Sequence, residues 1–177
     1  MASLPQLDYR EIVRDLEDLQ ACLTSLGLRR APVRLHGIIA NLKEIEQARA
    51  ENQLASLNTH PRVAELVWSV VEAQELADIF RSLQGYEPQV MKRLMQKALT
   101  GPLHPIHETL NSNIARNTVF ELALGARLRR AAAGVTMRQQ ADLLVDHAGA
   151  RLYIECKRPL YEHSIRRNIE KARRRFA

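Results

Sequence analysis

The chain of 177 residues is 46% hydrophobic and holds only seven glycines and seven prolines, which excludes a disordered polypeptide and favours a globular core. Its two cysteines, Cys22 and Cys156, lie far apart, which excludes a disulfide framework and zinc-finger spacing. No apolar run has the length of a membrane span, and Met1–Arg10 lacks the pattern of a signal peptide. We therefore expect a cytoplasmic protein without a membrane partner.

The net charge of +6 is distributed unevenly along the chain. Residues 1–100 hold 12 Lys and Arg against 13 Asp and Glu, whereas residues 101–177 hold 14 against 7. A concentrated positive charge suits a polyanionic partner such as nucleic acid. Mild positive charge is also common in soluble domains, so the alternative that this charge has no specific partner stays open.

Hydrophobic periodicity predicts four helices in the first hundred residues. They cover residues 7–26, residues from about 35 to 53, a helix starting at Asn58–Pro61, and a helix from Pro88 to about Gly101. Asp8 with Glu11 resembles a capping box at the first helix. The apolar stripes suit a small bundle, or a homo-oligomer formed through these helices.

The segment Gly101–Ser112 contains prolines that interrupt helical patterning, and it predicts a boundary between a helical region, 1–104, and a second region, 105–177. The same segment contains His104, His107 and Glu108, which could ligate zinc. Pro105 and the lack of a further ligand at a recognised spacing argue against such a site.

Residues 113–133 are predicted to form a helix that ends at Gly134. Apolar residues surround its middle, which predicts that this helix is buried. Glu121 lies in that apolar stretch and has no Lys or Arg one turn away. Either a distant Arg satisfies this carboxylate, or it helps to hold a metal ion.

Two apolar runs, 143–145 and 152–154, flank a turn with Ala148 and Gly149 as its loop residues, which predicts a β-hairpin. The register pairs Val145 with Leu152 and Leu143 with Ile154. A short preceding strand is predicted at 135–137.

This register also places Asp142 opposite Glu155 and, by alternation, Lys157 on the same face. Two opposed carboxylates repel each other, so a positive group must lie between them, either Lys157 or a bound divalent cation. Asp146 would face Arg151 and form a cross-strand ion pair. Cys156 would point to the opposite, buried face.

A last helix is predicted over residues 161–177, with its apolar stripe at Ile165, Ile169, Ala172 and Phe176. Basic residues occupy the remaining faces: Arg166, Arg167, Lys171, Arg173, Arg174 and Arg175. This surface is either a solvated cationic face or one that contacts phosphates.

An ordered set of residues resembles the PD-(D/E)XK nuclease superfamily, which has the restriction-endonuclease-like fold. The set is Glu121 in VFELALGARL, Asp142 in ADLLV, and Glu155-Cys156-Lys157 in LYIECKRP. The resemblance covers roughly residues 113–177. It implies an α+β, mostly helical protein, in which a helical N-terminal region precedes a restriction-endonuclease-like α/β core.

The resemblance implies that Asp142, Glu155, Glu121 and the backbone carbonyl of Cys156 hold Mg²⁺, with Mn²⁺ as a substitute, and that Lys157 orients the attacking water. DNA, rather than RNA, is the expected substrate. The expected nucleic-acid-binding residues are Arg158, Arg166, Arg167, Lys171 and Arg174.

The family's pattern and this chain differ at two points. Ala141 stands where the family has proline before the Asp. The family's fold also continues with a further strand, so the core is expected to be truncated after the helix that follows Glu-x-Lys, with loss of activity as one outcome. The alternatives are a non-catalytic nucleic-acid-binding protein and a helical protein-interaction module.

Overall fold

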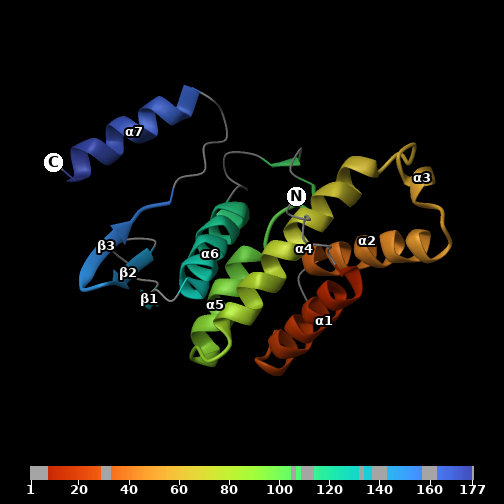
Figure 1. Ribbon diagram of the computed structural model, residues 1–177, viewed down its shortest axis with the longest axis horizontal. Helices are drawn as coiled ribbons and strands as arrows, with labels where there is room; N and C mark the ends of the chain where they lie inside the picture. Colours follow the sequence, from red (N-terminus) through yellow and green to blue (C-terminus); the bar gives the residue numbers. More distant parts are fainter. Residues whose placement is uncertain are drawn as a thin grey trace, which may run out of the picture. The chain divides into compact units, whose positions relative to one another are not determined.

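The computed structural model describes residues 8–28, 33–104, 107–108, 114–131, 134–136, 143–156 and 163–176 (Figure 1). Of these residues 71% are helical, and three short strands form one antiparallel sheet, which confirms the α+β, mostly helical class. The chain divides into two compact units, residues 1–115 and 116–177. Within the described ranges no helix is long and apolar enough to cross a membrane.

The described part of unit 1 is mainly helical, and α1, α2 and α4 pack against one another. The helices are α1 (Tyr9–Ser25), α2 (Val33–Ala50), α3 (Leu54–Leu57), α4 (Val63–Leu83) and α5 (Pro88–Ala98). The predicted inward residues of α2 are buried: Leu35, Ile38, Leu42 and Ile45. The bundle core therefore follows the stripes that the sequence predicted.

Two of the predicted helix starts are confirmed and one is wrong. The Asp8 carboxylate caps α1 by accepting from the backbone N–H of Arg10, at 3.0 Å, and Pro88 opens α5. Pro61, however, starts no helix, because it lies in a turn where the Arg62 N–H donates to Nδ1 of His60 at 3.2 Å. The helix that follows begins only at Val63.

Unit 2 contains most of α6 (Ile114–Arg130) together with a small sheet and a terminal helix. The sheet runs in the order β1 (Gly134–Thr136), β2 (Leu143–His147), β3 (Ala150–Ile154), and α7 spans His163–Phe176. Gly134, predicted to end the preceding helix, is instead the first residue of β1. Met137, predicted to belong to this strand, lies outside the described residues.

The sheet packs one face onto α6. Leu143 and Val145 of β2 form a buried cluster with Cys156, and Leu124 and Leu128 of α6 pack against this cluster. The sequence predicted that α6 is buried, but the helix is not buried on every side, since Phe120 is 41% exposed. Part of the surface of α6 is therefore open to water, while the stripe that faces the strands is shielded.

Candidate functional site

The β2–β3 hairpin has the predicted register. Leu143 pairs with Ile154 and Val145 with Leu152. The turn residues Ala148 and Gly149 have φ angles of +49° and +78°, the left-handed pair that a two-residue hairpin turn requires. The predicted ladder and turn are therefore confirmed over the described strands.

The two faces of this hairpin have different surroundings. The side chain of Cys156 is buried in the cluster beneath the sheet, which is the buried face predicted for it. Because neighbouring side chains of an extended chain alternate, Glu155 belongs to the other face, which also holds Tyr153 and Arg151. Glu155 is half-buried and has an interaction partner within the protein.

The remaining hairpin residues of the predicted metal site lie outside the described residues. These are Asp142 and Lys157, so the structure does not test whether they meet Glu155. Arg158, predicted to bind nucleic acid, also lies outside the described residues. In the part of the chain that is described, no group of three or more His, Cys, Asp or Glu side chains is arranged to hold a metal ion. The predicted Mg²⁺ site thus remains a prediction.

Glu121 differs from its predicted environment. It is half-buried in α6 rather than fully buried, and it has an interaction partner. The predicted full burial of this carboxylate is wrong, whereas its pairing with a distant arginine or a metal ion stays a prediction. The sequence pattern overestimated its burial because α6 keeps part of its surface, including Phe120, open to water.

The terminal helix α7 presents its cations to solvent. Arg166 forms an ion pair along the helix with Glu170, at 3.3 Å between Nε and Oε1, and its side chain is 91% exposed. The other exposed cations described on this helix are Arg167, Lys171, Arg173 and Arg174. The predicted apolar stripe is not buried at its described positions, since Ile165 is 45% and Ile169 56% exposed.

The histidine pair considered for zinc forms a ring contact. The rings of His104 and His107 meet edge to face, with centroids 5.9 Å apart. Glu108 acts electrostatically on buried Arg34. The described residues around this pair form no metal-binding group.

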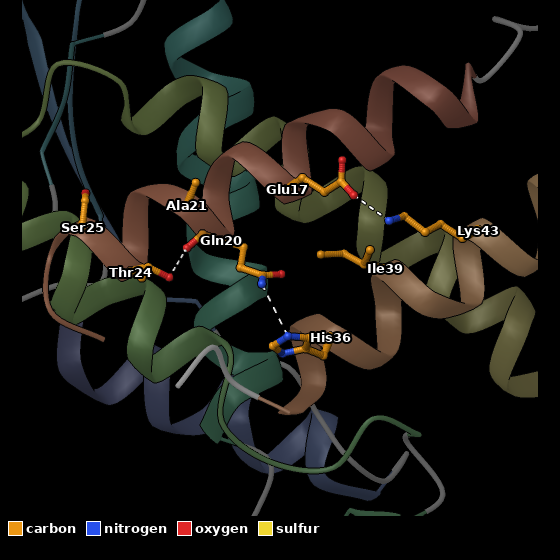
Figure 2. Close-up of a pocket in the computed structure, with 8 residues that line it drawn as sticks. All are labelled: Glu17, Gln20, Ala21, Thr24, Ser25, His36, Ile39 and Lys43. Atoms are coloured by element: carbon orange, nitrogen blue, oxygen red, sulfur yellow. Dashed lines mark hydrogen bonds and ion pairs between the residues drawn. The ribbon is translucent and has the colours of Figure 1, made fainter. Parts of the chain in front are cut away.

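A groove of about 760 Å³ lies between α1 and α2 of unit 1 (Figure 2). Its polar side chains already bind one another. Nζ of Lys43 lies 2.6 Å from Oε1 of Glu17, and the Gln20 amide lies 3.4 Å from Nε2 of His36. No sequence signal indicated this groove, because most of its lining residues are ordinary outward-facing side chains of two helices.

A buried charged pair in unit 1 was also missed. Arg34 of α2 is 2% exposed, and its guanidinium lies 2.9 Å from the carboxylate of Glu72, which is 4% exposed. Burial lowers the pKa of Arg34, while the charges of Glu108 and Glu75 raise it. Ile38, a predicted inward residue of α2, lies four residues after Arg34. This helical spacing could have placed the arginine on the same inward stripe.

Comparisons of the chain with protein-family models, with curated proteins and with solved structures find no match.

Proposed function

We propose that unit 2 is a nuclease-like domain that hydrolyses phosphodiester bonds in DNA with Mg²⁺. The observation that carries the proposal is the register of β2 and β3. If the ladder continues by one pair beyond Leu143 and Ile154, residue 142 stands opposite Glu155. That is the pairing of carboxylates that the resemblance to PD-(D/E)XK nucleases requires.

The donor set suits a hard cation. Asp142 and Glu155 would supply carboxylate oxygens, and Glu121 would assist from α6. Because the side chain of Cys156 is buried in the hydrophobic cluster, its contribution would be the backbone carbonyl alone. Oxygen ligands of this kind are those that Mg²⁺ binds, usually while keeping several waters.

Lys157 would orient the attacking water and offset negative charge on the phosphate. Mg²⁺, when bound, lowers the pKa of that water and screens the developing charge. Arg158, together with Arg166, Arg167, Lys171 and Arg174, would hold the DNA backbone. The exposure of the cations described on α7 supports this role. DNA is preferred over RNA because the resembling family mostly acts on DNA.

Cleavage of DNA, supplied both as a plasmid and as a linear single strand, tests the proposal. Cleavage should require Mg²⁺ or Mn²⁺, should cease with EDTA, and should be lost in Asp142→Ala and Lys157→Ala. Glu17→Ala and Lys43→Ala are matched controls, since they remove a carboxylate and a lysine that pair with each other in unit 1. Undiminished cleavage by Asp142→Ala and Lys157→Ala would refute the assignment.

A second candidate function is non-catalytic nucleic-acid binding by α7, which its exposed cations favour. Affinity should then fall steeply with salt and survive Asp142→Ala. Substituting Arg167 and Lys171 by Ala should reduce the slope of log K against log salt by roughly 2. As a control, substituting Arg93 and Lys97 of α5 by Ala should leave the slope unchanged. If the α7 substitutions also left the slope unchanged, binding through α7 would be excluded.

A further inference from the structure

Tyr153 lies half open to solvent on the hairpin face opposite the buried cluster. Its side chain is 51% exposed, whereas Leu144, its partner across the β2–β3 ladder, is only 1% exposed. Cross-strand partners are close enough for their side chains to touch. The tyrosine is thus backed by a buried leucine and leaves much of its surface free.

An ion pair lies next to Tyr153 on the same face of the hairpin. Nε of Arg151 donates to Oδ1 of Asp146 at 2.8 Å, across the strands, as the sequence predicted. The hydrogen bond and charge of Asp146, with a smaller effect of Tyr153, raise the pKa of Arg151. Arg151 and Tyr153 lie two residues apart on the same face of β3. The charge of Arg151 is offset by Asp146, so Arg151 is not expected to attract phosphate.

The position of Tyr153 along the strand connects it with the proposed metal site. Tyr153 and Glu155 are two residues apart in an extended segment, so they share a face and are separated by about 7 Å. This separation suits one nucleotide whose base lies on the ring and whose phosphate lies beside the carboxylate. A base in a duplex is already stacked on both sides, so only an unpaired base can use such a platform.

We propose that Tyr153 stacks on an unpaired base next to the scissile phosphate, so that the substrate is single-stranded DNA or the frayed end of a duplex. The inference rests on the proposed nuclease function and deepens it by naming the class of substrate. An aromatic platform accepts any base, because every base has a π face, and selectivity therefore arises from strandedness rather than sequence.

The test is equilibrium binding of the whole chain to two DNA ligands. One is a short single-stranded oligonucleotide with 2-aminopurine at its centre, and the other is the matching blunt duplex. Ca²⁺ replaces Mg²⁺ to prevent cleavage. Stacking quenches the fluorescence of the probe base. Tyr153→Ala should weaken single-strand binding roughly 5- to 150-fold and abolish the quenching, with little effect on the duplex. Tyr153→Phe keeps the ring and should bind nearly as the wild type does.

Leu152→Ala is the matched control, because Leu152 is adjacent in β3 and similarly exposed, at 53%, but on the opposite face. It should leave binding and quenching unchanged. Tyr153→Ile, which retains high strand propensity, should lose binding as Tyr153→Ala does if the ring matters rather than the integrity of the strand.

Equal affinity of wild type and Tyr153→Ala for the single strand would overturn the inference, as would equal losses in Tyr153→Ala and Leu152→Ala. Failure of the nuclease proposal gives a different result. In that case no Mg²⁺-dependent cleavage occurs, although the dependence of single-strand binding on Tyr153 persists.

Discussion

Arg34 of α2 and Glu72 of α4 form an ion pair inside unit 1, with 2.9 Å between Nη2 and Oε2 and side chains only 1% and 5% exposed. The same guanidinium donates from Nη1 to the carbonyl oxygens of Ala98 and Thr100, each at 3.2 Å. Carbonyls at a helix C-terminus lack partners within the helix. One arginine therefore joins α2, α4 and the end of α5.

Removing one member of this pair should destabilise unit 1 strongly. Arg34→Met removes the cation that pairs with the buried Glu72 carboxylate, and Glu72→Gln removes the carboxylate that pairs with the buried guanidinium; each should cost about 3–5 kcal/mol. Urea unfolding followed by the fluorescence of Trp68, which lies in α4, measures the change. The double variant Arg34→Met/Glu72→Gln should lose less than the two single losses combined, and strict additivity would contradict the coupling.

Glu65 should make unit 1 sensitive to acid. Its carboxylate accepts from Nδ2 of Asn41 at 3.0 Å and from Arg62, and these interactions, that of Asn41 first, hold its pKa below the usual 4.5 despite partial burial. A depressed pKa contributes stability above pH 4.5, which is lost as the pH falls through the folded-state value. Glu65→Gln should therefore be less stable near neutral pH but lose less between about pH 5 and pH 3.

An NMR titration of the Glu65 side chain checks the cause directly. In Asn41→Ala the midpoint should move up toward the usual value, because the largest stabilising interaction of the carboxylate is gone. An unchanged midpoint would mean that the amide does not lower this pKa.

A substitution at one position of the turn should stabilise the hairpin. Ala148 adopts a φ of +49°, which costs a residue with a β-carbon about 1–2 kcal/mol and costs Gly far less. Ala148→Gly should therefore stabilise the hairpin by up to about 1 kcal/mol, and Ala148→Asn by a smaller amount. Hydrogen exchange of the β2 and β3 amides should slow accordingly.

Gly149 provides the opposite control in the same turn. Its φ is +78°, and a β-carbon there would meet no atom within 4 Å, so Gly149→Ala tests backbone strain alone. It should speed amide exchange in both strands. Equal exchange rates in Gly149→Ala and the wild type would contradict the strain argument.

Substitution of Gly37 by alanine should gain little stability because of a side-chain contact. A β-carbon on this α2 residue would lie 2.7 Å from Cδ2 of Leu103. This atom is the far end of the half-buried Leu103 side chain, which must shift. That shift should offset most of the roughly 0.5–1 kcal/mol that Ala gains over Gly in a helix, so Gly37→Ala should leave the stability of unit 1 nearly unchanged. In a Leu103→Ala background the same change should stabilise, and thermal unfolding of the four variants distinguishes these outcomes.

Part of the candidate site could be predicted from the sequence because hairpin signals are local. Alternating apolar residues and a glycine in the turn determine the register of Leu143 with Ile154, and the Asp146–Arg151 pair follows from that register. The environment of Glu121 could not be obtained in this way, since the burial of a helix face depends on what packs against it. The predicted metal site itself, with Asp142 and Lys157, stays a prediction.

The sequence by itself determined the helical stripes of unit 1, the hairpin of unit 2 and the concentration of cations in the last helix, since each depends on the spacing of side chains along one element. Only the tertiary structure decided which polar residues are buried, as with Arg34 and Glu72. It also showed that Ile165 and Ile169 remain exposed on α7 and that Tyr153 faces solvent. The physical reason is that burial depends on packing between elements distant in sequence, which a periodic pattern does not specify.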